Sequence, residues 1–327
     1  MTDILIPEDV SGQPVEALRR QFEVALEPQL WRQPEALRQQ IAPCRALIVR
    51  NQTPVTAELL AAAEGLWIVG RAGSGLDNID VEAASRLGIV VSCTPDQNSL
   101  SVAELTLGLM LTLARHISVA SADTKAGGWA RKRFMGTELY GKTIGVIGFG
   151  RIGFLVAMRA KAMGMSVLAY DPLVSVDAAT VVQAQAKLVD LAALLQGSDY
   201  VTCHLPATPQ TRGFFDAARF AQMKPGAYLL NLARGEVIDE TALVAALRAG
   251  TLAGAALDVR AKEPPEPGPL NGLDQVILTP HIAAFTDEAQ HRVLSTVCRD
   301  VEAVLRGGTA INYHNFPSPR RGTRPCR

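Results

Sequence analysis

The sequence predicts an α/β protein with parallel β-sheets, arranged in two domains. Short apolar runs such as TIGVIG and AYLLNLA alternate along the chain with longer Ala- and Leu-rich stretches, which is typical of β-α-β units. These runs are apolar at successive positions, as expected of strands that helices cover on both faces. The chain has 327 residues, and at roughly 150 residues per domain this length corresponds to about two domains.

The expected strands and helices follow one another along the chain. Strand candidates start near residues 46, 66, 88, 143, 166, 200, 227, 254 and 275. Among the helical segments, 103–117 and 239–250 are the clearest, and Gly250 ends the second of them. The run near residue 143 is expected to open a second domain. The segment after Gly308 is rich in Pro and Arg without apolar periodicity, so we expect it to fray.

Composition and charge exclude several classes of function. Lys plus Arg (32) equals Asp plus Glu (32), so no net charge attracts the chain to nucleic acid or anionic lipid. No apolar segment reaches the roughly 20 residues of a membrane helix, and the first residues lack a signal-peptide pattern, which favours a cytoplasmic location. The cysteines are widely spaced and form no CxxC pair, so we expect reduced thiols and no metal site. They are Cys44, Cys93, Cys203, Cys298 and Cys326.

A glycine-rich turn at 148–153 predicts a dinucleotide site. It follows the apolar run TIGVIG and opens a helical pattern. Gly148 permits the tight turn, Gly150 lets the backbone approach a pyrophosphate, and Gly153 lets the helix pack closely on the strand. The next strand ends at Asp171, where a carboxylate can bind ribose hydroxyls and repel a 2′-phosphate, so NAD is favoured over NADP. The alternative is an ordinary glycine-rich turn with Asp171 at the surface.

Three polar residues predict a catalytic centre. Arg234 in NLARGEVIDE, Glu263 in AKEPPEP and His281 in TPHIAA each follow an apolar strand candidate. Open parallel sheets bind ligands beyond the carboxyl ends of their strands, so these side chains are expected to converge on the nicotinamide. Each residue taken singly also has an ordinary structural interpretation, respectively a salt-bridge residue, an exposed loop acid and a buried imidazole.

These motifs resemble those of the D-isomer-specific 2-hydroxyacid dehydrogenases over nearly the whole chain. The similarity extends to the segments 71–89, 94–105 and 128–153, and the last is most similar to the D-3-phosphoglycerate dehydrogenase branch. The resemblance implies two doubly wound parallel-sheet, Rossmann-like domains with a cleft between them. It implies a flavodoxin-like substrate-binding domain at 1–97 plus 290–327, an NAD-binding domain at 98–289, and a homodimer formed with the help of helix 100–118. We expect no regulatory domain.

The resemblance implies an NAD-dependent oxidoreductase that interconverts a small D-2-hydroxyacid and its 2-oxoacid. His281 would exchange the hydroxyl proton, Glu263 would hold the other imidazole nitrogen, and Arg234 would bind the carboxylate and the carbonyl oxygen. His204 would lie on the adenine side without a catalytic role. The implied substrate contacts are Arg50, Ser74, Gly75, Asn98 and Arg234. The implied cofactor contacts are Gly148, Gly150, Arg151, Ile152, Gly153, Asp171, Leu205, Pro206, Leu232, Ala233, Asp258 and Ala284.

Some positions depart from the family pattern and leave the substrate open. Arg260 stands where Phe is usual, and we expect it to pair with Asp258 or Glu263, or to extend an anion-binding surface. Phe285 is a second bulky residue that departs from the family pattern. Pro54 stands where the family often has Lys, which removes one cation. Arg131 and Arg133 remain as further candidates for anion binding. An anion-tailed substrate such as 3-phosphoglycerate, 3-phosphohydroxypyruvate or hydroxypyruvate is favoured. The alternatives are sulfolactate, a phosphonate analogue or a simple 2-oxoacid, and a non-catalytic NADH-sensing protein of the corepressor type.

Overall fold

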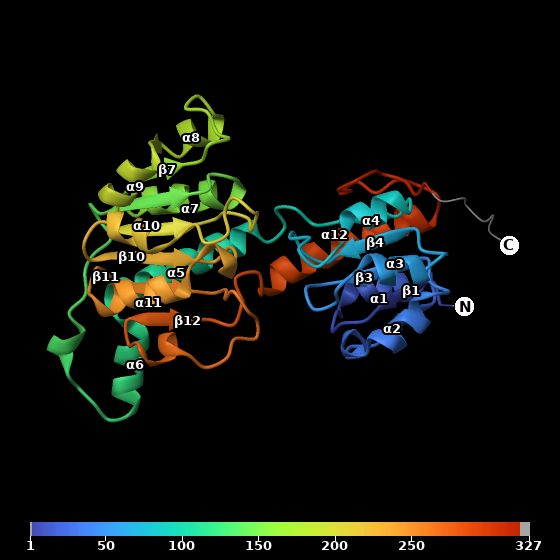
Figure 1. Ribbon diagram of the computed structural model, residues 1–327, viewed down its shortest axis with the longest axis horizontal. Helices are drawn as coiled ribbons and strands as arrows, with labels where there is room; N and C mark the ends of the chain where they lie inside the picture. Colours follow the sequence, from blue (N-terminus) through green and yellow to red (C-terminus); the bar gives the residue numbers. More distant parts are fainter. Residues whose placement is uncertain (1, 321–327) are drawn as a thin grey trace. The chain divides into compact units, whose positions relative to one another are not determined.

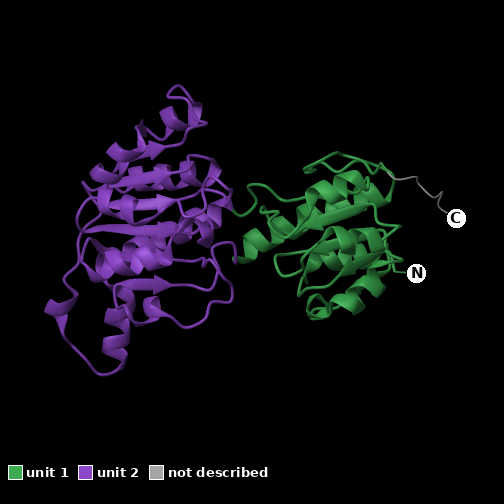
Figure 2. Cartoon of the chain, viewed as in Figure 1, with its two compact units in different colours: residues 1–98, 286–327 green, residues 99–285 purple. Residues whose placement is uncertain are grey.

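The computed structural model describes residues 2–320, which form two compact units (Figure 2). Unit 1 comprises Met1–Asn98 and Thr286–Arg327, and unit 2 comprises Ser99–Phe285. The second division lies at 285/286 rather than at the expected 289/290, because helix α12 (Asp287–Leu305) begins with Thr286 as its N-cap and packs along its length in unit 1. The Thr286 side chain accepts a hydrogen bond from the Ala289 amide, which is the usual way to start a helix.

Unit 1 is a five-stranded parallel sheet covered by helices on both faces (Figure 1). Its strand order is β2-β1-β3-β4-β5. The strands are β1 (Ile4–Ile6), β2 (Val24–Leu26), β3 (Ala46–Val49), β4 (Ile68–Arg71) and β5 (Val90–Ser92). Helices α1 (Gln13–Arg19) and α12 pack on one face, and α2 (Pro34–Ile41), α3 (Ala57–Ala62) and α4 (Val81–Arg86) pack on the other. This two-sided burial explains why the strands are apolar at successive positions.

Unit 2 is a seven-stranded parallel sheet in the order β12-β11-β10-β9-β6-β7-β8. Its strands are β6 (Thr143–Ile147), β7 (Ser166–Tyr170), β8 (Lys187–Leu188), β9 (Tyr200–Cys203), β10 (Ala227–Asn231), β11 (Leu252–Leu257) and β12 (Val276–Leu278). One core lies under α5 (Ser99–Arg115), α7 (Arg151–Ala162) and α8 (Ala179–Gln183). The other lies under α9 (Leu191–Gly197), α10 (Ala217–Gln222) and α11 (Glu240–Arg248). The predicted fold class, two doubly wound parallel-sheet units, is confirmed.

The strand order of unit 2 reverses at β6. The chain runs outward through β7 and β8, and then returns to place β9 on the other side of β6. Ligands of open parallel sheets bind at such a reversal, beyond the carboxyl ends of the strands. The glycine-rich turn follows β6 directly, so the fold places it where a ligand is expected.

The long helix expected around 100–118 is broken. Helix α5 ends at Arg115, His116 has a left-handed backbone with φ 53°, and α6 continues as Ile117–Lys125. A short 3₁₀ turn, Arg131–Phe134, follows. Within the described residues, no single helix is long and apolar enough to cross a membrane; α5 and α6 pass that test only when joined across their 63° bend.

The segment after Gly308 does not fray over its described part, so that prediction is wrong for residues 309–320. The buried carboxylate of Asp300 accepts hydrogen bonds from the amides of Ile311 (2.9 Å) and Asn312 (3.1 Å). Asn315 accepts from the Val91 amide and donates to the Ile89 carbonyl, both at 2.9 Å. Polar pairing with β5 therefore orders a segment that has no apolar pattern. Residues 321–327, with Cys326, lie outside the described part of the chain.

Candidate active site

A carboxylate–imidazole pair lies at the carboxyl edge of the sheet in unit 2. Glu263 follows β11 and His281 follows β12, and these two strands are parallel neighbours. Glu263 Oε2 lies 2.7 Å from His281 Nδ1. The two side chains are 33% and 42% exposed, so a ligand can reach them. With Nδ1 facing the carboxylate, Nε2 is the ring nitrogen at which a proton can be exchanged with a ligand.

The loop that carries His281 is fixed by Asp258. This carboxylate is 1% exposed and accepts hydrogen bonds from Thr279 Oγ1 (2.5 Å) and from the amides of Ile282 and Ala283 (both 2.9 Å). The His281 amide donates to the Asp258 carbonyl oxygen at 2.8 Å, and the His281 backbone is left-handed with φ 56°. Because a left-handed backbone is unfavourable for a side chain other than glycine, these bonds hold His281 in a conformation that it would not adopt alone.

Glu263 is held in its charged form. Burial acts to raise the pKa of this carboxyl, but the hydrogen bonds from His281 and from the Arg260 amide, with the nearby charges of His281 and Arg234, lower the pKa below its ordinary value. The Arg260 amide donates to Glu263 Oε1 at 3.0 Å. Glu263 is therefore a fixed anion beside His281 at neutral pH.

Arg234 follows β10 in a turn that Asn231 organises. The buried Asn231 side chain donates to the Arg234 carbonyl oxygen at 2.8 Å and accepts from the Ala233 amide at 3.1 Å. Arg234 itself donates from Nη1 to the Ala233 carbonyl oxygen at 2.8 Å. Its guanidinium acts on the Glu263 pKa, so the two side chains share one electrostatic environment. Sequence reasoning missed Asn231, although an Asn at the end of an apolar strand was a usable signal.

The side chain of Arg260 does not pair with Asp258 or Glu263, so that expectation is wrong. Its guanidinium forms two bonds with Glu240 on α11, Nε to Oε1 at 2.8 Å and Nη2 to Oε2 at 2.6 Å. A guanidinium engaged in this way offers little to a substrate anion, which removes the reason to treat Arg260 as an anion-binding residue. Phe285 is 58% exposed, and nothing in the structure explains this residue.

The glycine-rich turn has the shape that a pyrophosphate requires. Gly148 has φ 87°, and a Cβ there would lie 2.8 Å from the His204 carbonyl oxygen. A Cβ at Gly153 would overlap the Gly148 carbonyl oxygen, so α7 can pack on the turn only with glycine at this position. By contrast, a Cβ at Gly150 would meet no atom within 4 Å. The space above Gly150, at the start of α7, is thus open to a phosphate group and fits NAD.

Asp171 is joined to this turn at the end of β7. Its Oδ2 accepts from the Phe149 amide at 2.8 Å, and its Oδ1 accepts from the Leu173 amide at 2.9 Å. The carboxylate therefore lies beside the turn that would hold the pyrophosphate, where ribose hydroxyls are expected. The other predicted cofactor contacts also follow strands of this sheet: Arg151 and Ile152 after β6, Leu205 and Pro206 after β9, Leu232 and Ala233 after β10, Asp258 after β11, and Ala284 after β12.

His204 is buried next to the same turn. Its Nε2 lies 3.1 Å from Thr202 Oγ1, and burial lowers the pKa of its imidazole to about 4. A ring with this pKa is neutral at physiological pH. The geometry agrees with a structural role for His204 and leaves His281 as the histidine that faces a carboxylate.

The four substrate contacts predicted in the N-terminal part lie in unit 1, after successive strands of its sheet. Arg50 follows β3, Ser74 and Gly75 follow β4, and Asn98 follows β5. The loop of Arg50 is held by the buried Glu8, which accepts from the Arg50 amide at 2.9 Å. Burial lowers the pKa of Arg50, while Glu8 and Asp9 oppose this effect.

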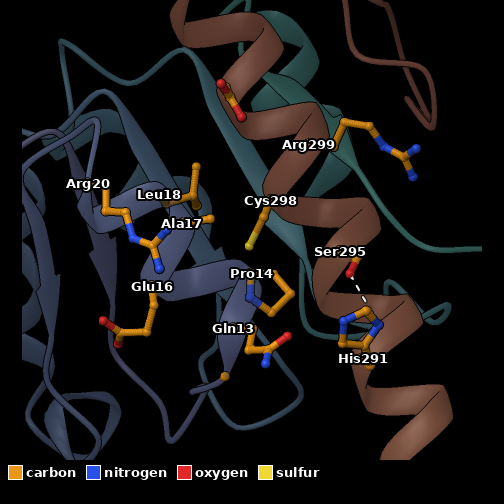
Figure 3. A pocket seen from close by; sticks show the side chains of 12 residues that line it. Gln13, Pro14, Glu16, Ala17, Leu18, Arg20, His291, Ser295, Cys298 and Arg299 are labelled. Carbon is orange, nitrogen blue, oxygen red and sulfur yellow. Dashed lines mark hydrogen bonds between the residues drawn. The ribbon is translucent and has the colours of Figure 1, made fainter.

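Two other features lie away from these residues. Arg133 is 3.8 Å from Asp123 and 3.7 Å from Asp274, so acidic neighbours balance its charge. Both Arg131 and Arg133 are exposed. A surface depression between α1 and α12 in unit 1 contains His291, whose Nδ1 lies 3.5 Å from Ser295 Oγ (Figure 3). None of the predicted site residues lines it. Within residues 2–320, no group of three His, Cys, Asp or Glu side chains is placed to hold a metal ion.

The fold and the glycine-rich turn define unit 2 as a dinucleotide-binding domain of the doubly wound class. Residues 107–283 match the NAD binding domain of the D-isomer specific 2-hydroxyacid dehydrogenases. The chain belongs to this family, as its sequence motifs predicted, and NAD as the cofactor of this domain is confirmed.

Individual relatives agree with this assignment. The chain is 46% identical over 317 residues to the D-3-phosphoglycerate dehydrogenase of Archaeoglobus fulgidus, covering 96% of this chain and 59% of that protein. It therefore spans about three fifths of that relative's length. The TT0316 protein of Thermus thermophilus is 34% identical with a TM-score of 0.89, covering 95% of this chain and 99% of that one. D-lactate dehydrogenase of Aquifex aeolicus, solved with NAD and lactic acid, is 29% identical with a TM-score of 0.86, covering 96% and 99%.

Proposed function

We propose that this protein is an NAD-dependent dehydrogenase that interconverts a D-2-hydroxyacid and its 2-oxoacid. The observation that carries the proposal is the 2.7 Å contact between Glu263 and His281 at the carboxyl edge of the sheet that also bears the dinucleotide turn. We further propose 3-phosphoglycerate and 3-phosphohydroxypyruvate as the substrate pair, because the 46% identical relative is named for that substrate. No comparison supports sulfolactate, a phosphonate analogue or a corepressor-like role.

The proposed chemistry separates hydride transfer from proton transfer. NAD, when bound, accepts or supplies the hydride. His281 Nε2 takes the hydroxyl proton during oxidation and returns it to the carbonyl oxygen during reduction. Glu263 keeps the ring oriented through Nδ1 and stabilises the imidazolium. Arg234 presents a planar set of donors that orients the substrate carboxylate and stabilises negative charge on the reacting oxygen.

The remaining site residues are proposed as binding contacts. In unit 1, Arg50, Ser74, Gly75 and Asn98 would contact the carboxylate or the anionic tail of the substrate. In unit 2, the cofactor would contact Gly148, Gly150, Arg151, Ile152, Gly153, Asp171, Leu205, Pro206, Leu232, Ala233, Asp258 and Ala284. Their positions after the carboxyl ends of the strands support this assignment.

We also propose that the protein forms a homodimer in the cytoplasm. Exposed apolar side chains occur on α5 and α6 and in the segment that follows them: Leu111, Ile117, Trp129 and Met135 are 37%, 51%, 78% and 78% exposed. Apolar surface of this kind is typical of a protein interface. The four described cysteines are free and buried, which supports a reducing compartment. Sedimentation equilibrium of the wild type and of Ile117→Asp tests the dimer, which the variant should weaken.

The test of the proposed activity is the loss of NADH absorbance with purified protein and a panel of 2-oxoacids. The panel contains 3-phosphohydroxypyruvate, hydroxypyruvate, sulfopyruvate, phosphonopyruvate, pyruvate, oxaloacetate and 2-oxoglutarate. We expect 3-phosphohydroxypyruvate to give the highest kcat/KM. Preference for another member would overturn the substrate, and binding of NADH without turnover of any member would overturn the activity.

Asp171→Asn should relax the preference for NADH. The amide keeps one oxygen, which can still accept from the Phe149 amide of the glycine-rich turn. The bond from the Leu173 amide and the charge that repels a 2′-phosphate are lost. We expect the ratio of kcat/KM for NADH over NADPH to fall about 10-fold. Asp177→Asn, an exposed acid in the following loop, is the matched control and should leave the ratio unchanged. An unchanged ratio in Asp171→Asn would show that this carboxylate does not contact the ribose.

Glu263→Gln should move the pH profile of reduction toward acid. Reduction requires a protonated His281, and its proton is lost as the pH rises. The pKa of Glu263 lies below its ordinary value, so the carboxylate is charged over the working range and favours the imidazolium. Without that charge, the alkaline midpoint of kcat/KM should fall by about one pH unit. Glu266→Gln in the same loop is the control, and an identical midpoint in both variants contradicts the pairing.

A further inference from the structure

We infer that Glu240 and Arg260 are positioning residues for the Glu263–His281 pair. The inference rests on the proposed function, because it assigns a role to residues that act on the proposed catalytic histidine. Neither residue faces His281 directly. They act through the backbone of the loop that carries Glu263, and this loop joins β11 to the segment before β12.

The contact between Glu240 and Arg260 is a two-bond pair on a rigid support. The Nε–Oε1 and Nη2–Oε2 distances are 2.8 and 2.6 Å, and the side chains are only 29% exposed for Glu240 and 11% for Arg260. Paired bonds of this kind fix the orientation of both planar groups. Glu240 is the first residue of α11, whose Leu243 and Leu247 lie in the core. The pair therefore fastens the loop to a helix that these two leucines anchor in the core.

The pair remains charged over the working pH range. The hydrogen bond from Arg260 lowers the pKa of Glu240 against the effect of burial, and the same hydrogen bond raises the pKa of Arg260. The contact between the two side chains is therefore present throughout that range.

A continuous series of bonds leads from α11 to the imidazole. Glu240 holds the guanidinium of Arg260, the Arg260 amide donates to Glu263 Oε1 at 3.0 Å, and Glu263 Oε2 meets His281 Nδ1 at 2.7 Å. The orientation of the Glu263 carboxylate is thus set by where the Arg260 peptide lies. The residues after it, 261–267, are exposed, so the surrounding loop supplies little other support.

The same peptide also supports the loop of Arg234. A Cβ at Gly235 would overlap the carbonyl group of Arg260 and the amide nitrogen of Ala261. The backbone after Arg234 therefore lies directly on the peptide that the Glu240–Arg260 pair anchors. A shift of this peptide would disturb the Glu263 bond and the turn of Arg234 together, which is why an ion pair outside the chemistry is expected to affect kcat.

The experiment compares Glu240→Gln, Arg260→Met and the double variant with the wild type. We expect kcat for the reduction to fall about 10-fold in each single variant, with Kd for NADH within twofold. The alkaline midpoint of kcat/KM should move toward acid by about half a pH unit. This shift has the same direction as the one expected for Glu263→Gln and is smaller. The fall in kcat in the double variant should be no larger than in either single variant. Arg260→Lys should retain a higher kcat than Arg260→Met. Lys262→Met is the matched control, since it breaks an exposed ion pair with Glu266 in the same loop.

The outcomes separate this inference from the proposed function. A lower Tm with unchanged kcat and unchanged pH midpoint in both single variants would overturn the positioning role. If the wild type reduces no 2-oxoacid, the proposed function fails, and positioning is then measured from the ¹⁵N chemical shifts of the His281 ring as a function of pH. A titration curve displaced in Glu240→Gln but not in Lys262→Met supports positioning, and identical curves overturn it.

Discussion

His281→Ala lowers kcat for the reduction of a 2-oxoacid by about 10³-fold while the Kd for NADH changes less than twofold. A positioned general acid contributes about 10² to 10⁴ in rate, and His281 is the histidine whose Nδ1 meets a carboxylate at 2.7 Å. The methyl group of Ala leaves the Asp258 bonds to the amides of Ile282 and Ala283 in place. Stopped-flow measurement of hydride transfer and fluorescence titration with NADH provide the two quantities.

His291→Ala is the matched control for this experiment. His291 lies on α12 in unit 1, and the structure gives it a contact with Ser295 rather than with a carboxylate. Its removal should leave kcat within twofold of the wild type. Equal losses in the two variants would point to a general effect on folding, and full activity in His281→Ala would overturn the proposed mechanism.

Most strands of both units could be predicted because they are buried, and a buried strand shows in the sequence as a run of successive apolar residues. The runs near 143 and 227 became β6 and β10, which are buried along nearly their whole length. The strands without a prediction are β1, β2 and β8, which have two or three residues each. Length alone does not separate them from β5 and β12, which also have three residues but lie in longer apolar runs that were predicted. The strand state of β1, β2 and β8 depends on pairing with neighbours that are distant in sequence.

The break at His116 and the order of the last residues were missed for a related reason. Nothing in the local sequence around His116 stops a helix, and the left-handed residue there marks the point where α6 turns away from α5 at 63°. Residues 311–315 have no apolar pattern, and they are ordered by Asp300 and by the edge of β5. Such polar long-range contacts leave no periodic trace in a sequence.

For the candidate site, the rule that ligands bind beyond the carboxyl ends of parallel strands located the functional side chains. It did not identify the residues that hold those side chains in place. Glu263 and His281 could be placed at one sheet edge because both follow parallel strands. The partner of Arg260 could not be predicted in this way. Glu240 lies 20 residues away in the sequence, and the two side chains meet only because the fold places the start of α11 beside the loop. Asp258 was predicted only as a cofactor contact. In the structure its carboxylate also accepts three hydrogen bonds from the loop that carries His281.

Arg234→Lys lowers kcat/KM for the 2-oxoacid by about 10²- to 10³-fold, the loss expected when a charge-stabilising donor is removed from the reacting oxygen. Lysine keeps the charge but loses the planar fork that can hold a carboxylate and a carbonyl oxygen together. Its shorter reach also removes the bond from Nη1 to the Ala233 carbonyl oxygen, which orients the side chain. We expect kcat to fall and KM to rise, because Arg234 acts on both the bound substrate and the transition state.

Arg248→Lys is the matched control, since Arg248 is an exposed residue at the end of α11 in the same unit. It should leave both constants unchanged. A rise in KM alone for Arg234→Lys would restrict Arg234 to binding the carboxylate and exclude charge stabilisation at the carbonyl oxygen. Unchanged constants would exclude any contact between Arg234 and the substrate, and the anchored turn of Asn231 and Gly235 would then require another explanation.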